Sequence, residues 1–171
     1  MNHPLARVIR ETAPFLLVGD SDSDRFPAVS YHCYMQGDRP FFCLDLGGLS
    51  ESRGFTKGGP VMRSLDELPE DWGGDLAIVW VHPFRAAEVV RMVAGVGCSR
   101  VWFSFQTVSD EAVQTARQLG VEVVEAGRCP VFYMAEQAAW PCKVHTLVAR
   151  LSGTRALPPQ TDARAGRREL Y

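Results

Sequence analysis

Short apolar runs alternate with amphipathic segments along most of this chain. The runs are apolar throughout, which is typical of strands covered on both faces of a parallel sheet. The amphipathic segments between them are typical of the covering helices, so the alternation predicts successive βαβ units. The predicted strands are residues 15–18, 41–44, 76–81, 100–103 and 121–124, with a weaker extended stretch at 61–62.

Two helices are predicted between the later strands. Residues 85–96 place three valines on one helical face, and the glycine that follows is a suitable C-terminal stop. Residues 109–119 begin with Ser109 as N-cap and carry two acidic residues in the first turn, which the helix dipole favours. The positions of this second helix expected to face inward are Val113, Ala116 and Leu119.

Two more elements complete the predicted fold. A helix over residues 24–36 follows the first strand, with Pro27 tolerated in its first turn. Ser64 and Glu67 have the spacing of a capping box for one short turn. The predicted fold class is α/β, a three-layer Rossmann-like open parallel sheet with helices on both faces.

The C-terminal part of the chain has a different character. Pro141 is expected to open a helix in which apolar residues recur at i, i+3, i+4 and i+7. This stripe could cover a sheet edge or mediate a homodimer. Beyond Ser152 the chain is rich in Pro, Ala and Arg, which favours a flexible basic tail. The stripe comprises Val144, Leu147, Val148 and Leu151, and the expected units are residues 1–134, 135–152 and 153–171.

Composition narrows the class of protein. The 171 residues suit one domain, and a net charge of -2 gives no general case for nucleic-acid binding. Basic residues concentrate from Lys143 onward, where a solvated tail is favoured over a binding arm. Five cysteines without a CxxC pair match neither a disulfide framework nor a zinc site. We expect a cytoplasmic protein without membrane contact, since no apolar leader or spanning run of about 18 residues is present.

The loop after the first predicted strand is the leading candidate site. A buried strand that turns through Gly19 and Asp20 into a helix forms a nest of N–H groups that suits a phosphate. The hydroxyls of Ser21 and Ser23 could donate to phosphate oxygens, and Arg25 could supply positive charge. The dinucleotide fingerprint GxGxxG is absent, however, and the aspartates repel phosphate. An equal alternative is therefore a solvent-exposed loop without a ligand, in which Asp22 or Asp24 accepts the hydrogen bonds of the free N–H groups.

Other candidate residues also follow predicted strands. Asp45 stands where a carboxylate often binds an adenosine ribose, which keeps an NAD(P)-binding oxidoreductase as an alternative. Lys57 lies between glycines in a loop, where it could reach a phosphate or be solvated. His82, Pro83 and Arg85 lie at the carboxyl edge of the sheet, where open α/β sheets bind ligands. No metal ligand or catalytic residue is assigned, because the histidines do not cluster and no nucleophile elbow is present.

A series of short motifs follows in a distinctive order along residues 13–133. They are Gly19-x-Ser21 with Arg25, the segment from Ser64 to Pro69, Val81-His82-Pro83, the segment from Gly97 to Trp102, Glu111-Ala112, and Arg128-Cys129-Pro130. In this order they resemble the small CoA-binding proteins whose domain is shared with the N-terminal part of the succinyl-CoA synthetase α subunit. Four positions depart from the family pattern: Cys43 and Asp45 stand around the second strand where the family has Pro and Asn, and Ser104 and Gln106 follow the tryptophan where it has Gln and Gly.

The resemblance implies a non-catalytic protein that binds CoA or acyl-CoA, a small nucleotide ligand. The first loop would hold the CoA phosphates, Lys57 and the end of the second strand would border the adenosine, and residues 81–83 would line the groove. Related synthetases need a further domain with a phosphorylated histidine, so catalysis is not expected. A third hypothesis, besides CoA binding and an NAD(P)-binding oxidoreductase, is a protein that has lost the ligand and serves as an interaction module. The candidate ligand-binding residues are Gly19, Asp20, Ser21, Ser23, Arg25, Asp45, Lys57, His82, Pro83, Arg85 and Gln106.

Overall fold

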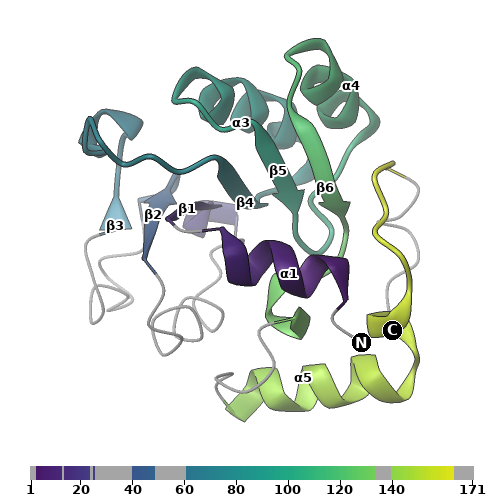
Figure 1. The fold of residues 1–171 in the computed structure, drawn as a ribbon. Helices are drawn as coiled ribbons and strands as arrows, with labels where there is room; N and C mark the ends of the chain where they lie inside the picture. Colours follow the sequence, from purple (N-terminus) through teal and green to yellow (C-terminus); the bar gives the residue numbers. More distant parts are fainter. Residues whose placement is uncertain are drawn as a thin grey trace.

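A parallel sheet forms the centre of the computed structural model, which describes residues 3–12, 14–23, 25, 40–48, 61–133 and 140–163 (Figure 1). Within these ranges the sheet has six strands in the order β3-β2-β1-β4-β5-β6, and every pair of neighbours is parallel. The predicted fold class is therefore confirmed. The strands are β1 Phe15–Gly19, β2 Phe41–Asp45, β3 Val61–Met62, β4 Leu76–Trp80, β5 Arg100–Phe103 and β6 Glu122–Ala126.

Helices cover both faces of this sheet. Figure 1 shows α3 and α4 side by side on one face, with α1 on the opposite face and α5 farther out on that side. The described helices are α1 Pro4–Glu11, α3 Pro83–Gly95, α4 Asp110–Gln118 and α5 Trp140–Leu151. Short 3-10 turns are η1 Ser21–Ser23, η2 Leu65–Glu67, η3 Pro130–Tyr133 and η4 Thr154–Ala156.

The strands contribute alternate side chains to two apolar cores. Leu16 and Val18 of β1 pack in a cluster with residues of α3 and α4, while Leu17 packs in a second cluster with Leu5 and Ile9 of α1. This alternation follows from the period of two along a strand. Because both faces are covered, every residue of β1 is buried, which explains why the sequence shows continuous apolar runs rather than alternation.

Local signals in the sequence correspond closely to the observed turns. The Ser64 hydroxyl accepts a hydrogen bond from the backbone of the following turn, and Glu67 Oε1 accepts one from Ser64 N at 3.0 Å, so the capping box is present. The Ser109 hydroxyl caps α4. Leu119 was expected to face inward, but its side chain is 50% exposed. The reason is that α4 ends at Gln118, which leaves Leu119 as the C-cap residue.

Two differences from prediction occur near the N-terminus. The sequence patterns did not indicate α1, whose N-cap is His3 and whose first turn begins with Pro4. The predicted helix over residues 24–36 begins wrongly, because Arg25 forms a β-bridge with Asp20. The remainder of that predicted helix lies outside the described residues.

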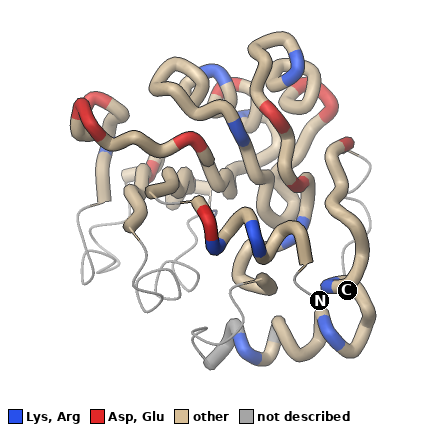
Figure 2. Tube along the Cα trace, viewed as in Figure 1, with Lys and Arg blue, Asp and Glu red and all other residues tan. Residues whose placement is uncertain are grey.

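The C-terminal helix has its apolar stripe on the opposite side from that expected of a covering helix. Thr146 and Ala149 are buried against the protein, whereas the stripe is exposed, so α5 does not cover a sheet edge with it. Figure 2 shows basic residues along α5 and η4, in agreement with the concentration of positive charge in this part of the sequence. At the start of the expected flexible tail, the backbone oxygens of Thr154, Leu157 and Pro158 accept hydrogen bonds from Arg128. Residues 164–171 lie outside the described part.

Candidate functional site

The strand order reverses direction between β1 and β4. From β1 the sheet continues to β2 and β3, and from β4 it continues to β5 and β6. In open α/β sheets such a switch point leaves a crevice at the carboxyl ends of the strands, where ligands bind. The loop after β1 and the N-terminus of α3, which follows β4, both lie at this position.

The loop after β1 closes on itself through its backbone. Asp20 N donates to Arg25 O at 3.2 Å, and Arg25 N donates to Asp20 O at 2.8 Å. Ser23 N donates to Asp20 O at 3.3 Å, and Ser21 N donates to the Asp45 carboxylate at 2.9 Å. Four of the amides expected to form a phosphate nest therefore already have protein acceptors.

Asp45 holds this loop against the loop that follows β2. Its Oδ1 accepts from Ser21 N and from Gly47 N at 3.0 Å, and its Oδ2 accepts from the Ser21 hydroxyl at 2.7 Å. The side chain is 1% exposed, and both oxygens are engaged. A Cβ on Gly47 would lie 2.4 Å from Asp22 N, so only glycine permits this approach. Asp45 thus shapes the loop, and in this arrangement it is not directed at a ribose.

A partly buried ion pair crosses the switch point. Arg85 Nη1, from the first turn of α3, lies 2.8 Å from Asp20 Oδ2, and the Ser23 hydroxyl donates to the same oxygen at 3.0 Å. Asp20 is 1% exposed, and its other oxygen, Oδ1, has no donor among the residues that the structure describes. Buried polar atoms are normally hydrogen-bonded, so this buried oxygen beside the first loop is an exception.

The N-terminus of α3 has no capping side chain, whereas the N-terminus of α4 has one. His82 is the N-cap of α3 but its side chain makes no capping hydrogen bond, and the first turn contains no acidic residue. In α4 the Ser109 side chain caps the helix, and two acidic residues stand in the first turn. Phe84, 72% exposed, packs beside the His82 ring at 4.5 Å between centroids. The positive end of the α3 dipole is therefore presented at the switch point without a capping side chain.

A third strand end also reaches the loop after β1. Gln106, which follows β5, has φ of 50° and lies in the left-handed region that favours glycine. Its Oε1 accepts a hydrogen bond from Arg25 Nη2 at 3.4 Å. The backbone thus keeps the conformation that a glycine would adopt here, and the glutamine side chain adds a contact to Arg25.

The structure brings most of the predicted residues together. Direct contacts connect the first loop with Arg85 and Gln106, and His82 and Pro83 adjoin Arg85 at the start of α3. Lys57 lies outside the described residues. Sequence reasoning missed the role of Gly47 and the hydrogen bond from Gly48 N to Asp22 Oδ1 at 2.9 Å. The glycine pair directly after β2 was the signal that could have indicated this close approach.

Metal binding, thiol chemistry and membrane insertion find little support among the described residues. No group of three or more His, Cys, Asp or Glu residues there is placed to hold a metal ion. Burial among apolar side chains raises the pKa of the Cys43 thiol, with the Asp45 carboxylate adding to the effect, so this thiol stays protonated at neutral pH. None of the helices in those ranges combines the length and apolar character needed to cross a bilayer.

Comparison with known families gives the identity of the domain. The family described as CoA binding domain matches residues 16–135, which include all of β2 to β6, β1 except its first residue, and the whole candidate site. The chain belongs to the CoA-binding domain family. The resemblance seen in the sequence is therefore confirmed at the level of the family, whose matched region begins after α1 and ends before α5.

Solved structures with the same fold include proteins from Pyrococcus and Thermus species. A hypothetical protein from Pyrococcus horikoshii OT3 is 19% identical with a TM-score of 0.61, and the match covers 78% of this chain and 89% of that one. A conserved hypothetical protein from Pyrococcus furiosus is 22% identical with a TM-score of 0.53, covering 68% and 95%. A protein from Thermus thermophilus is 19% identical with a TM-score of 0.54, covering 73% and 90%. No curated protein matches the chain. These likenesses support the fold of this CoA-binding domain.

Proposed function

We propose that this protein binds CoA or acyl-CoA in the crevice between the carboxyl ends of β1 and β4, without catalysing a reaction. The observation that carries the proposal is the placement of the closed first loop and the open N-terminus of α3 at the switch point of a CoA-binding domain. We further propose that the protein is cytoplasmic and that it is related to the succinyl-CoA synthetase-like members of the family.

The phosphates of CoA would depend on arginine and on α3 rather than on a nest of loop amides. Four amides of the first loop are already bonded within the protein. Arg25 and Arg85 are the described cations at the loop, and a guanidinium can form paired hydrogen bonds with a phosphate. The N-terminus of α3 adds favourable partial charge for an anion. Arg25, which has the weaker of the two protein contacts, is the side chain we expect to move to the ligand.

The acidic residues at the first loop are compatible with CoA binding if they face parts of CoA other than its phosphates. The carboxylates of Asp20 and Asp45 are each neutralised or hydrogen-bonded by protein groups, so their charge is partly compensated. Asp20 Oδ1 is a buried acceptor that could receive a hydrogen bond from an amide N–H, and the pantetheine arm carries two such groups. An NAD(P) ligand receives no comparable support, because the Asp45 carboxylate is engaged by Ser21 and Gly47.

The proposed binding is tested by calorimetric titration of the purified protein with CoA, acetyl-CoA, NAD and NADP. We expect CoA and acetyl-CoA to bind and Arg25→Ala to weaken CoA binding about tenfold, which is 1.4 kcal/mol. Arg91→Ala is the matched control, since Arg91 lies on α3 with a side chain 57% exposed and pairs only with Glu111 among the contacts found. It removes the same charge and should leave the affinity unchanged.

Three results would contradict parts of this proposal. Tighter binding of NAD than of CoA would favour the oxidoreductase alternative. No heat with any of the four compounds would favour an interaction module that has lost its ligand, in which the Asp20–Arg85 pair fills the anion position. Equal loss of affinity in Arg25→Ala and Arg91→Ala would show that the arginine at the loop has no specific role.

A further inference from the structure

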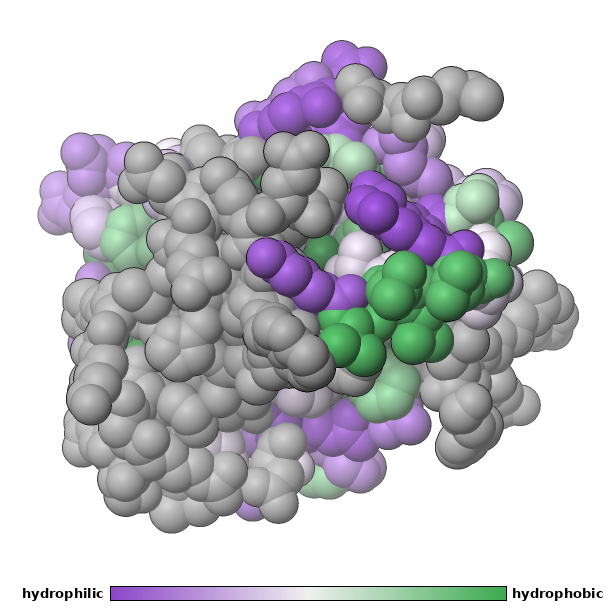
Figure 3. Space-filling view, turned by 90° about the horizontal axis from the view of Figure 1, so that it is seen from below, coloured by the Kyte–Doolittle hydropathy of each residue, from purple (hydrophilic) through white to green (hydrophobic). Residues whose placement is uncertain are grey.

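The outward face of α5 carries the apolar stripe. Val144, Leu147, Val148 and Leu151 are 41%, 54%, 45% and 80% exposed. The inward face instead buries Thr146, 5% exposed, and Ala149, 0% exposed. Figure 3 shows strongly apolar residues gathered on the surface seen from this side, next to hydrophilic ones. A helix that buries threonine and alanine while it exposes two leucines and two valines leaves a partner-binding surface uncovered.

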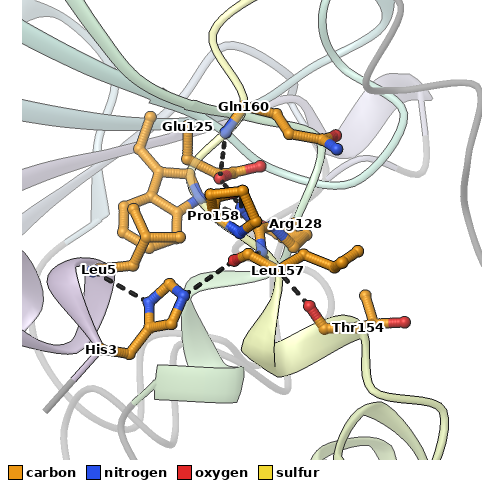
Figure 4. A network of polar contacts seen from close by, with 9 residues as sticks. His3, Leu5, Glu125, Arg128, Thr154, Leu157, Pro158 and Gln160 are labelled. Atoms are coloured by element: carbon orange, nitrogen blue, oxygen red, sulfur yellow. Dashed lines mark hydrogen bonds and ion pairs between the residues drawn. The ribbon is translucent and has the colours of Figure 1, made fainter. Parts of the chain in front are cut away.

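The orientation of α5 is fixed by the segment that follows it. The buried guanidinium of Arg128 donates to the backbone oxygens of Leu157 and Pro158, both at 2.8 Å, and to that of Thr154 at 3.3 Å. It also pairs with the buried Glu125 carboxylate, which in turn accepts from Gln160 N at 3.1 Å. Figure 4 shows these contacts meeting beside the N-terminal His3. The chain just after α5 is therefore anchored, and the stripe is held facing away from the body.

We propose that this stripe is the interface with a second copy of the chain. Spacing at i, i+3, i+4 and i+7 is the seam by which two helices pack together. A two-fold axis through the middle of the stripe pairs antiparallel helices so that Val144 lies opposite the partner's Leu151, and Leu147 opposite the partner's Val148. Each contact then joins a larger to a smaller side chain, and one surface serves both subunits, as a two-fold interface requires.

The area that such a pairing buries is sufficient for a weak dimer. A helix of 12 residues is about 18 Å long and about 10 Å wide with its side chains. That footprint is about 180 Å² on each copy, and complete burial of the four stripe side chains and the half-exposed Leu157 in both copies would remove at most about 1,000 Å² of accessible surface, which is near the lower limit for a specific interface. We therefore expect dissociation at micromolar concentrations rather than an obligate dimer.

Charge gives the dimer a characteristic dependence on salt. Lys143, Arg150 and Arg155 are the charged residues of α5 and η4, and all three are basic. In the antiparallel pair Lys143 and Arg150 of both copies stand on the same flank, so like charges approach each other. Added salt screens this repulsion and should strengthen the dimer. Binding to an anionic bilayer or to an acidic protein would instead weaken as salt is added.

Sedimentation equilibrium of the full chain without CoA tests this proposal. We expect a reversible dimer whose dissociation constant rises at least tenfold in Leu147→Ser/Leu151→Ser. Leu119→Ser is the control, because Leu119 is a similarly exposed leucine at the C-cap of α4, away from α5, and its substitution should leave the constant unchanged. Thermal unfolding should show all three proteins equally folded, since the substituted side chains are exposed. Raising NaCl from 0.1 to 0.5 M should strengthen the dimer of the unsubstituted chain.

A monomer at several hundred micromolar protein, or a dimer that is insensitive to the double substitution, would overturn the proposal. So would co-sedimentation with vesicles containing phosphatidylglycerol that is lost in the double variant and weakened by salt, which would assign the stripe to a bilayer surface. The dimer does not depend on the proposed CoA binding. Its failure therefore leaves the calorimetric result for CoA unaffected.

Discussion

Replacing Arg128 with methionine removes a buried guanidinium while keeping an unbranched apolar side chain in place of the arginine's aliphatic stem. The guanidinium is the partner of Glu125, which is 0% exposed, and it binds three backbone oxygens of the segment after α5. In Arg128→Met the Glu125 carboxylate keeps only the Gln160 N–H among the donors found, at 3.1 Å. A charge is then left in the interior without a counter-ion.

The expected loss of stability follows from these contacts. Breaking one side of a buried ion pair costs about 3–5 kcal/mol, because the remaining charge is uncompensated. Each lost hydrogen bond to a backbone oxygen adds about 1 kcal/mol, unless the oxygen regains water. Release of residues 154–160 would rehydrate those three oxygens and admit water to Glu125. We therefore expect a loss of about 3 kcal/mol in the free energy of unfolding, accompanied by detachment of this segment.

Urea unfolding followed by tryptophan fluorescence measures the loss, and limited proteolysis measures the detachment. The double variant Glu125→Leu/Arg128→Met should be more stable than Arg128→Met alone, because it replaces the whole pair with apolar groups. A loss below about 1 kcal/mol in Arg128→Met, which is the range of exposed ion pairs, would refute the reasoning. So would a double variant that is less stable than the single one.

The remaining predictions concern single groups in the loop and the core. Asp45→Ala should lower the free energy of unfolding by about 3 kcal/mol, because three buried donors lose their acceptor, while Asp45→Asn should cost about 1 kcal/mol; urea unfolding measures both. Gln106→Gly should be about 1 kcal/mol more stable than Gln106→Ala by the same assay, since only glycine adopts the positive φ without strain. Burial raises the pKa of the Cys98 thiol to about 12. A thiol reagent at pH 8 should therefore modify Cys98 only at the rate at which the protein unfolds, which peptide mapping over time measures. Burial likewise raises the pKa of Tyr133 to about 12 against about 10 in the unfolded chain, so the tyrosine should add a loss of stability as pH rises from about 10 toward 12, on top of the loss that the buried Cys43 and Cys98 thiols cause from about pH 8.5; Tyr133→Phe should remove only the tyrosine's part of this fall.

The parallel sheet was predictable because its strands are buried on both faces and its helices show a clear period. Ser64 and Ser109 were correctly interpreted because a capping side chain acts within a few residues along the chain. The orientation of α5 was not predictable, because the stripe is equally compatible with covering the body or with facing a partner. Only the anchoring of the following segment by Arg128 decides between these, and that contact joins residues 26 to 30 positions apart.

The candidate site shows the same division between local and distant effects. The sequence placed Asp20, Ser21 and Arg85 correctly at the carboxyl edge, because that edge follows from the strand boundaries. It could not show that Asp45 turns toward Ser21, since the two lie 24 residues apart and meet only through the pairing of β1 with β2. The interpretation of Asp45 as a ribose ligand depended on position alone, whereas its actual partners are backbone and hydroxyl donors.

The central claim is that CoA binds where the loop after β1 meets the N-terminus of α3. Amide chemical shifts of isotope-labelled protein, recorded during titration with CoA, test this most directly. We predict saturable shifts that concentrate at Ser21, Arg25, Phe84 and Gln106, with little change in α4 or α5. Shifts that saturate elsewhere on the molecule, or no shifts at millimolar CoA, would contradict the claim.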